Sequence, residues 1–375
     1  MSFAEVMDAY AGLDMPTAIH DSQRQDVLRA LGKERLGPED LLALLSPAAG
    51  AMLEELARKA AALTLQHFGR AVQLFTPLYV SDFCANRCVY CGFNAEQKGP
   101  RRQLSLEEVR VEAEHIAATG LRQILVLTGD ARAKAPPEYL EQVLEVLREY
   151  FPSLLLEVYA QTQEEYARMI TAGAEGLTIY QETYDSEQYR RMHPSGPKRD
   201  YGFRLDAPER ACRAGMRWVG IGALYGLGDW RRDAFWAAMH ARWLQDRYPG
   251  AEIGLSLPRM RPHAGAWQPE HPVSDRDLTQ ILLAQRLFLP RATITLSTRE
   301  PARLRENLLP LGVTRLSAGV STSVGGHGAD QAGTPQFEVA DDRSVGEIAA
   351  MLRNKGCQPV FKDWQPLTVP DEGRG

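Results

Sequence analysis

Three cysteines within eight residues are the part of this sequence best able to do chemistry. Cys84, Cys88 and Cys91 follow the spacing C-x3-C-x2-C, and the aromatic Tyr90 directly precedes the third cysteine. Thiolates this close in sequence can point inward from one loop and hold an iron–sulfur cluster. Three thiolates would bind three irons of a 4Fe-4S cluster. The fourth iron would stay open to a ligand that is not protein, as catalytic metal sites in general keep one position free.

Two other uses of these cysteines fit the sequence less well. The chain has five cysteines in 375 residues, an odd number, and its N-terminus lacks the basic and apolar stretches of a secretory signal, which disfavours a disulfide scaffold. A structural zinc site usually needs a second Cys/His pair, and His115 and Cys212 do not form one at zinc-finger spacing. Cys212 and Cys357 are isolated, and we expect each to be a small buried apolar residue.

The motif C-x3-C-x-aromatic-C resembles the signature of the radical S-adenosylmethionine (SAM) superfamily. The resemblance implies that the amino and carboxylate groups of SAM chelate the open iron and that Tyr90 lies along the adenine. It also implies that SAM is a cosubstrate beside the 4Fe-4S cluster. The motif says little about the second substrate, which the rest of the chain must indicate.

The composition is that of an ordinary soluble globular protein, with 44% hydrophobic and 24% charged residues. No apolar run approaches the roughly 20 residues that a membrane span needs, so no membrane association is expected. The net charge of −5 gives no reason to expect nucleic-acid binding. Free cysteines and the lack of a targeting segment predict a cytoplasmic location.

Short apolar runs rich in β-branched residues alternate with longer amphipathic segments from residue 74 onward. Such alternation predicts a parallel sheet with helices outside it. Eight units that close on themselves make a (β/α)8 barrel, with an open sheet as the alternative. The expected strands are Leu74–Val80, Gln123–Leu127, Leu154–Tyr159, Gly176–Tyr180, Trp218–Ile221, Ile253–Leu257, Thr293–Leu296 and Val313–Leu316.

Helical patterns lie between and after these strands. Two of them begin at Ser105-Leu-Glu-Glu108 and Thr162-Gln-Glu-Glu165, which resemble N-terminal capping boxes. The apolar residues among the first seventy-odd positions also recur at helical spacing, and Gly69 is expected to end the last helix of this region. We therefore expect a helical extension over residues 1–72, the barrel over 73–356 and a tail over 357–375. The expected barrel helices are Ser105–Ala118, Pro137–Tyr150, Gln163–Thr171, Ala207–Arg213, Arg232–Arg247, Ser274–Leu289, Pro301–Leu309 and Ser344–Lys355.

In a (β/α)8 barrel the catalytic groups lie at the C-terminal ends of the strands, and unusual residues follow the predicted strands here. After the second strand, Thr128-Gly129-Asp130 resembles the superfamily's Gly-Gly-Glu element, which holds the SAM amino group. Thr128 and Asp130 stand where this element has its first Gly and its Glu. We therefore expect only the backbone of this turn to contact SAM as it does in the superfamily. The alternative is a turn in which Asp130 caps a helix.

Three further rim segments are candidates for binding SAM. Glu182 could accept hydrogen bonds from ribose hydroxyls or a substrate amine, or be a surface glutamate. Tyr159 and Gln161 are weaker candidates of the same kind. The segment from Gly222 through Gly228-Asp229, with Gly222 and Gly226 as the candidates, resembles the adenine-side segment of radical SAM barrels, since glycine lets the backbone approach a ligand closely. It follows the fifth strand, which disfavours a Rossmann dinucleotide site.

Three arginines at strand ends are candidates for binding an anionic substrate group. Arg259, Arg261 and Arg299 lie beside the expected cavity, and a buried guanidinium needs an anion. A carboxylate of an amino acid or of SAM would fit, and Arg299 is the preferred anchor of the substrate carboxylate. Salt bridges to carboxylates such as Glu300 are the alternative. Ser317, at the next strand end, could hydrogen-bond the amino-acid moiety.

The whole chain resembles one branch of the superfamily, the tyrosine lyases of thiamine biosynthesis. The matching pieces span about residues 35 to 365 and are LLALLSPAA, PLYVSDFCANRCVYCGF, QETY, PRMRP, LSTRE and FKDW. The resemblance implies that a 5′-deoxyadenosyl radical takes a hydrogen from the amino group of L-tyrosine. The Cα–Cβ bond then breaks to give 2-iminoacetate and p-cresol, with methionine and 5′-deoxyadenosine from SAM.

The resemblance also implies partners and leaves alternatives. A thiazole synthase subunit would take the labile imine, and an external one-electron reductant of the flavodoxin or ferredoxin type would reduce the cluster. Relatives in hydrogenase assembly add a second C-terminal cluster, for which we see no cysteine pair before Gly375. A radical SAM lyase acting on another aromatic amino acid such as tryptophan is the rival enzyme. An Fe–S electron-transfer or scaffold protein is the non-enzymatic alternative.

Overall fold

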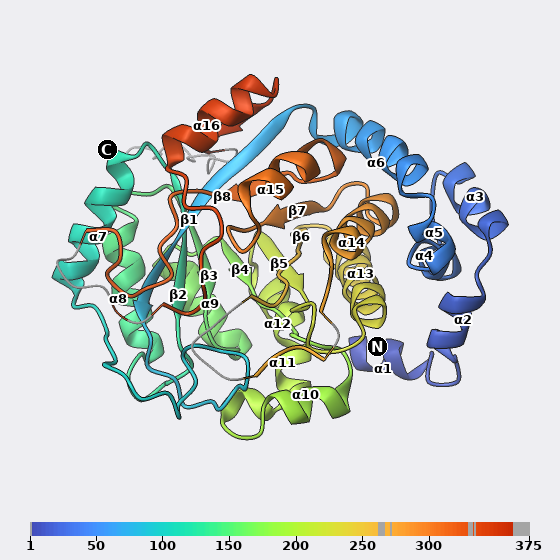
Figure 1. The fold of residues 1–375 in the computed structure, drawn as a ribbon. Coiled ribbons are helices and arrows are strands. Elements are labelled where there is room, and N and C mark those ends of the chain that lie inside the picture. Colours follow the sequence, from blue (N-terminus) through green and yellow to red (C-terminus); the bar gives the residue numbers. More distant parts are fainter. Residues whose placement is uncertain (1, 262–266, 271, 329–332, 334, 363–375) are drawn as a thin grey trace, which may run out of the picture.

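Eight parallel strands close into a barrel in the computed structural model, which describes residues 2–261, 267–270, 272–328, 333 and 335–362. Each strand pairs with the next in sequence, and β8 pairs with β1 to close the ring (Figure 1). The predicted (β/α)8 fold is therefore confirmed. The strands are β1 (Ala71–Ser81), β2 (Gln123–Thr128), β3 (Ser153–Glu157), β4 (Gly176–Thr178), β5 (Trp218–Gly222), β6 (Glu252–Ser256), β7 (Thr293–Leu296) and β8 (Arg315–Ser317).

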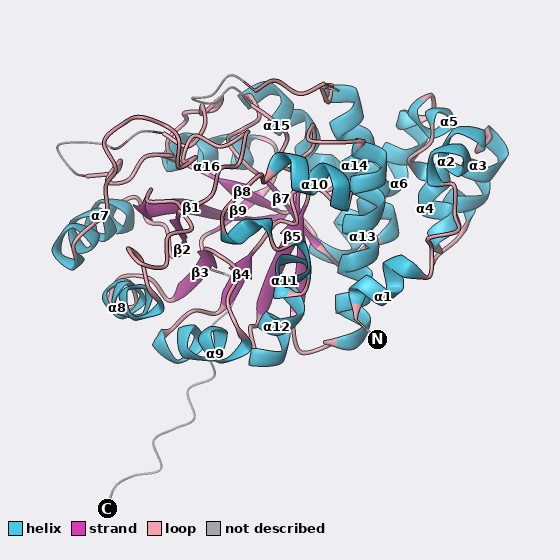
Figure 2. Ribbon diagram, turned by 90° about the horizontal axis from the view of Figure 1, so that it is seen from below, coloured by secondary structure: helices cyan, strands magenta, loops and turns pink. Residues whose placement is uncertain are grey.

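Helices surround the barrel, as Figure 2 shows from a second direction. Both predicted capping boxes are present: the Ser105 hydroxyl accepts from the Glu108 amide at 3.2 Å, and Thr162 caps Glu165 in the same way. No helix in the described part of the chain is long and apolar enough to cross a membrane. The outer helices are α7 (Leu106–Ala118), α8 (Pro137–Leu147), α9 (Gln163–Ala172), α12 (Ala207–Ala214), α13 (Trp230–Arg247), α14 (Asp275–Phe288), α15 (Ala302–Leu308) and α16 (Val345–Asn354).

The expected helical extension forms six helices, which lie to one side of the barrel in Figure 1. The last of them packs along α14 and stops at Gly69, whose φ of 61° most other residues avoid. Side chains of the barrel also reach the extension, since the Gln280 amide donates to the Leu44 and Ser46 carbonyls. The helices are α1 (Phe3–Asp8), α2 (Met15–Asp21), α3 (Arg24–Gly32), α4 (Pro38–Leu44), α5 (Pro47–Gly50) and α6 (Leu53–Phe68).

Two regions hold elements that the sequence patterns did not predict. Helices α10 (Ser186–Met192) and α11 (Tyr201–Leu205), with the 3-10 turn η1 (Pro197–Arg199), connect β4 to α12. They are too short to show a clear helical period. The region expected as a C-terminal tail supplies a ninth strand, β9 (Gln358–Val360), which pairs in parallel with the first residues of β1. Pro262, Asp363 and Trp364 of the quoted motifs lie outside the described residues.

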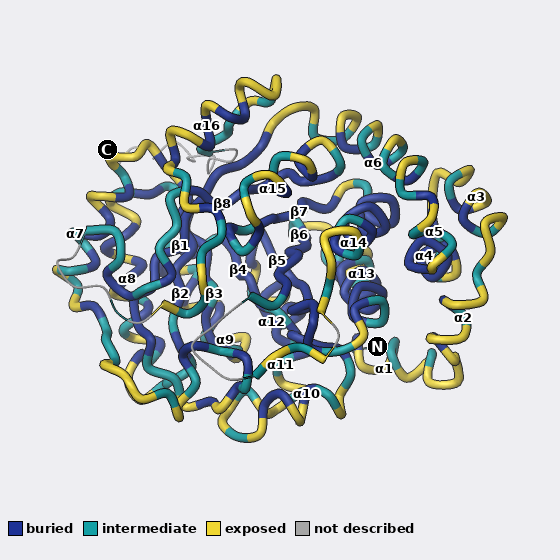
Figure 3. Tube along the Cα trace, in the orientation of Figure 1, coloured by how far each residue is buried: buried dark blue, intermediate teal, exposed yellow. Residues whose placement is uncertain are grey.

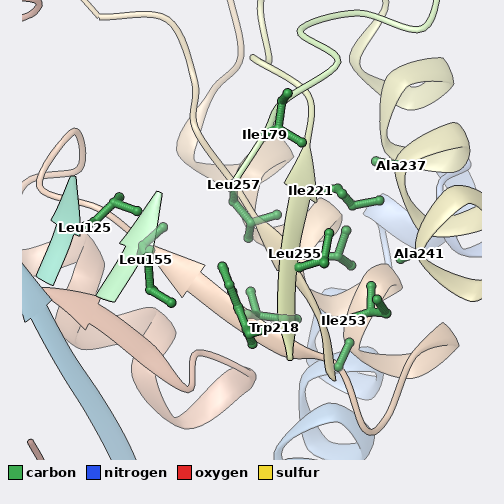
Figure 4. Packing of buried hydrophobic residues seen from close by; sticks show 14 of the residues in the cluster. Leu125, Leu155, Ile179, Trp218, Ile221, Ala237, Ala241, Ile253, Leu255 and Leu257 are labelled. Atoms are coloured by element: carbon green, nitrogen blue, oxygen red, sulfur yellow. The ribbon is translucent and has the colours of Figure 1, made fainter. Parts of the chain in front are cut away.

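The N-terminal end of the barrel is filled by side chains, which leaves the opposite end free for a ligand. The Trp218 indole lies against Gly220 and Gly254, where an added Cβ would come within 2.2 and 2.8 Å of the ring. The Arg315 guanidinium stacks on the same indole at 4.1 Å. Figure 3 shows the strands of the barrel as largely buried, and Figure 4 shows Trp218 among apolar side chains of neighbouring strands.

Candidate active site

The cysteine loop follows β1 and brings all three cysteines to one cavity at the C-terminal end of the barrel. Backbone hydrogen bonds hold the loop on two sides. The Ala85 amide donates to the Asp130 carbonyl at 2.8 Å, and the Val89 amide donates to the Met192 carbonyl at 3.2 Å. We call this space the rim cavity. It has a volume of about 130 Å³, and its walls include Cys84, Cys88, Cys91, Tyr90, Asp130, Tyr159, Glu182 and Arg261.

The three thiols suit a cluster of several irons. Burial raises the pKa of Cys88 to about 12 and also raises the pKa of Cys91, so these groups need a cationic partner to be thiolates. In the described ranges, no three His, Cys, Asp or Glu side chains converge on the position of a single metal ion. In a 4Fe-4S cluster each thiolate binds its own iron, so the sulfur atoms stand apart. Because three thiols line one cavity, the residues present fit the cluster.

The turn after β2 forms a close-fitting wall against the cysteine loop. A Cβ at Gly129 would lie 2.3 Å from the Phe83 carbonyl oxygen, so only glycine fits there. Asp130 accepts a hydrogen bond from the Asn86 amide at 2.9 Å, and its second oxygen is buried without a described partner, as is the Thr128 hydroxyl. Helix α8 is capped at Pro136, so Asp130 is not its N-cap. Unsatisfied acceptors beside a cavity are suited to a ligand with donor groups.

We expect Gly129→Ala to lower SAM affinity at least tenfold, because the methyl group must push the Phe83–Cys84 backbone out of position. Equilibrium binding of SAM to the reconstituted protein measures the effect. Gly250→Ala is the matched control, since nothing lies within 4 Å of its added Cβ. Equal affinities for both variants would contradict the role assigned to this turn.

Glu182 is held by two cations in the wall of the rim cavity. Its carboxylate pairs with Lys198 at 2.5 Å and with Arg204 at 3.5 Å. Burial acts to raise its pKa, but these two charges outweigh burial and keep the pKa below the ordinary glutamate value. Its φ of 71° is the one positive value among the described non-glycine residues. Such backbone strain costs about 1–3 kcal/mol and is typical of functional sites.

Tyr90 is fixed by a histidine that the sequence patterns did not indicate. The Tyr90 hydroxyl lies 2.7 Å from His193 Nε2, while His193 Nδ1 lies 2.8 Å from the Tyr189 carbonyl. Nδ1 must donate to that carbonyl, so Nε2 accepts from Tyr90. Burial lowers the pKa of His193 to about 3, which keeps the imidazole neutral. The Tyr90 ring is therefore held in one orientation in the wall of the cavity.

The other residues predicted to bind SAM differ in whether they line the rim cavity. Tyr159 lines it, and its hydroxyl donates to the Ala135 carbonyl at 2.9 Å. Gly222 and Gly226 are not among its described lining residues. An added Cβ at Gly222 would lie 2.6 Å from the Ser256 carbonyl oxygen, so packing against β6 requires this glycine. Gly226 has a φ of 110°, a turn conformation that favours glycine. Their part in SAM binding stays a prediction.

A second space, the inner cavity, continues from the rim cavity into the barrel. Five residues line both: Glu157, Tyr180, Pro258, Arg299 and Phe337. The inner cavity has a volume of about 70 Å³. Its walls are mainly apolar and aromatic, with a few hydroxyls, and include Phe75, Leu125, Leu127, Leu257, Val320, Ser256, Thr295 and Ser317.

The three arginines predicted to bind an anionic group have different environments, and Arg261 lines the rim cavity. Arg259 pairs with Glu300 at 2.9 Å and with Asp275 at 2.6 Å, the salt-bridge alternative raised from the sequence. Arg299 lies where the two cavities meet, with its guanidinium 3.5 Å from the centre of the Phe337 ring. No described carboxylate pairs with Arg299. Arg299 is therefore better placed than Arg259 to receive an external anion, as is Ser317 nearby in the inner cavity.

A parallel barrel whose first strand leads into three thiols that face one cavity is the arrangement of radical SAM barrel enzymes. Two family models match the chain: the radical SAM superfamily over residues 78–235 and the biotin and thiamin synthesis associated domain over residues 256–358. The chain is 40% identical to 2-iminoacetate synthase of Escherichia coli K12 over 352 residues, 94% of this chain and 93% of that protein. The chain belongs to the 2-iminoacetate synthase family of the radical SAM superfamily.

Other known proteins share the sequence or the fold of this chain. The 2-iminoacetate synthase of Salmonella typhimurium LT2 is 39% identical over the same share of both chains. A crystal structure of HydG, a maturase of the FeFe-hydrogenase, superposes with a TM-score of 0.88 at 31% identity, over 93% of this chain and 79% of that one. Methylornithine synthase (PylB) shares the fold, with a TM-score of 0.72 at 20% identity, over 89% of this chain and 97% of that one.

Proposed function

We propose that this chain is a radical SAM lyase that cleaves the Cα–Cβ bond of L-tyrosine into 2-iminoacetate and p-cresol, for thiazole formation in thiamine biosynthesis. One observation carries the proposal most: Arg299, without an acidic partner in the described structure, lies where a thiol-lined cavity meets a cavity with apolar walls. An aromatic amino acid combines the carboxylate and the ring that these two features would bind. The 40% identity to 2-iminoacetate synthase supports tyrosine as that amino acid.

The residues of the rim cavity would hold the cosubstrate. Cys84, Cys88 and Cys91 would bind a 4Fe-4S cluster, while the backbone at Gly129 and the carboxylate of Glu182 would bind SAM. When bound and reduced, the cluster and SAM supply the one-electron chemistry, with methionine and 5′-deoxyadenosine as products. The protein's own contribution is to orient the two substrates and exclude water. The filled N-terminal end of the barrel suits the second task because side chains such as Trp218 and Arg315 occupy it.

The inner cavity would hold the amino acid. The Arg299 guanidinium would bind the carboxylate, and Ser317 would hydrogen-bond the same part of the substrate. The ring would then extend between apolar walls such as Phe75 and Leu127. In this arrangement the amino group faces the rim cavity, where hydrogen abstraction must take place.

The proposal includes partners outside the chain. An external one-electron reductant of the flavodoxin or ferredoxin type would reduce the cluster. A thiazole synthase subunit would accept 2-iminoacetate, because an imine hydrolyses readily in water. A cytoplasmic location would suit the reduced cysteines that the cluster needs.

Product analysis with different amino acids tests the substrate. The reconstituted protein is incubated without oxygen with SAM, a reductant and either tyrosine or tryptophan. We expect p-cresol from tyrosine and no indole product from tryptophan. An indole product would instead assign the chain to the rival lyase. Absence of 5′-deoxyadenosine with every aromatic amino acid would favour the Fe–S electron-transfer or scaffold alternative.

Replacing the proposed carboxylate anchor should weaken substrate binding. Arg299→Ala removes charge-assisted hydrogen bonds worth about 1.5–3 kcal/mol, so we expect tyrosine affinity to fall roughly 10- to 100-fold. Equilibrium binding in the presence of SAM measures the change. Arg303→Ala, at an exposed position of α15, is the control. Unchanged affinity in Arg299→Ala would remove Arg299 as the anchor.

A further inference from the structure

Glu157 is a carboxylate at the junction of the two cavities that the sequence patterns did not single out. It is the last residue of β3 and lines both the rim cavity and the inner cavity. In the described part of the chain, its carboxylate has neither a hydrogen-bond partner nor a salt bridge. Arg299 lines the same two cavities. The junction therefore presents one cation and one anion, which interact electrostatically, and neither forms a salt bridge or a side-chain hydrogen bond with a described residue.

Two acidic residues of the site, Glu157 and Glu182, have opposite electrostatic environments. Burial raises the pKa of Glu157 to about 7, and the Arg299 charge offsets only part of this effect. Glu182 is buried as well, but Lys198 and Arg204 lower its pKa. Two titratable groups whose pKa values are driven apart usually have different roles in a reaction. Glu182 is suited to remain an anion, whereas Glu157 is suited to exchange a proton near neutral pH.

The proposed reaction needs a proton acceptor at the substrate nitrogen. A free amino acid carries its α-amino group as an ammonium at neutral pH. An ammonium nitrogen has no lone pair to stabilise the unpaired electron that remains when a hydrogen atom leaves. The nitrogen must therefore lose a proton before a hydrogen atom is taken from it, and a group within hydrogen-bond reach must receive that proton.

We propose that Glu157 is the catalytic base that receives this proton from the substrate ammonium, an inference that rests on the proposed function. The N–H bond breaks, its electron pair stays on nitrogen, and the proton bonds to a carboxylate oxygen of Glu157. The products of this step are a neutral amine and a carboxylic acid, so no further reactant is needed. The neutral amine keeps the N–H bonds from which the hydrogen atom is then taken.

The geometry favours the amino group over the substrate's phenol as the donor. The carboxylate and ammonium of an amino acid are attached to the same carbon, so a substrate anchored at Arg299 has its ammonium beside the junction. Glu157 lines that junction. The phenol lies at the other end of the substrate, deeper in the inner cavity, where the lining side chains offer neutral hydroxyls such as Ser256 and Thr295.

The first test is turnover by Glu157→Gln, which keeps the size of the side chain and removes its basicity. We expect p-cresol formation to fall about 10²- to 10⁴-fold, while iron content and SAM affinity stay at the wild-type level. Glu145→Gln, on the exposed side of α8, is the control and should be unaffected. p-Cresol formation by Glu157→Gln at a rate within twofold of the control would overturn the proposal.

The second readout is the pH profile of kcat/KM. Since Glu157 accepts a proton only when ionised, the wild-type value should fall below about pH 7, where the carboxyl becomes protonated. Glu157→Asp should keep an acidic limb at reduced rate, and Glu157→Gln should lose that limb. If the fall in kcat/KM at acidic pH were unchanged in Glu157→Gln, that fall would be due to another group. The charged and titratable groups that face Glu157 are Arg299, Glu182, Arg204, Lys198, Tyr79 and Tyr180.

Equilibrium binding separates this inference from the proposed function, because it needs no turnover. Glu157→Gln should bind tyrosine about tenfold or more weakly than wild type, but bind 3-(4-hydroxyphenyl)propanoate, which lacks the amino group, equally well. Equal losses for both ligands would overturn the contact with the amino group. A loss for tyrosine but none for phenylalanine would move Glu157 to the phenol. If wild type made no p-cresol, the proposed function would fail, and this comparison would still decide the contact.

Discussion

Cys88→Ser is expected to abolish cluster loading and all SAM cleavage. The three thiols line one cavity, and the loss of one leaves the cluster with two protein ligands and a second open iron. Serine is a poor substitute because its hydroxyl does not become an anionic ligand at neutral pH as a thiol can. Iron and sulfide content and 5′-deoxyadenosine formation after anaerobic reconstitution measure the effect, and both should fall to background.

Cys357→Ser is the matched control for this prediction. Cys357 is half-buried directly before β9 and is not among the described residues that line the rim cavity. The control should load iron and cleave SAM like the wild type. Full activity of Cys88→Ser, or the same loss in both variants, would contradict the cluster assignment.

Glu182→Gln is expected to cause the second largest loss, in both stability and SAM binding. The change leaves Lys198 and Arg204 without their carboxylate in a buried site, and breaking a buried pair in this way typically costs about 3–5 kcal/mol. The thermal midpoint should fall by several degrees. SAM affinity should fall more than tenfold, because the carboxylate is also the proposed partner of the ribose. Calorimetry and equilibrium binding measure the two effects.

A double variant separates these two contributions. Glu182→Gln combined with Lys198→Met removes one uncompensated cation, so part of the lost stability should return. SAM affinity should remain low because the carboxylate is still absent. Recovery of SAM affinity together with stability would mean that Glu182 acts only through the fold.

The fold was predictable because its signals repeat along the chain. Most strands contain a buried apolar run, such as Gln123–Thr128, and several outer helices combine an amphipathic period with a capping residue such as Ser105. The elements that were missed lack such signals. Gln358–Val360 has no apolar run and becomes a strand only because β1 extends far enough to pair with it. Pairing between distant segments cannot be inferred from a local period.

The site was predictable only where residue type and spacing point to one chemistry. The cysteine motif does so, and the structure brings its thiols to one cavity. Arg259 and Arg299 both follow strands, so sequence position could not separate them; the salt bridge between Arg259 and Glu300 does. Glu157 and His193 carry no local motif. Their properties come from burial and from neighbours distant in sequence, which only the folded chain defines.

The most direct test of the account is the ratio of two products formed in one reaction. The anaerobically reconstituted enzyme is incubated with SAM, a reductant and L-tyrosine, and p-cresol and 5′-deoxyadenosine are quantified together. If cleavage of SAM is coupled to cleavage of tyrosine at the junction of the two cavities, the two products should appear in equal amounts and both should depend on tyrosine. Formation of 5′-deoxyadenosine without p-cresol at any tyrosine concentration would contradict the account.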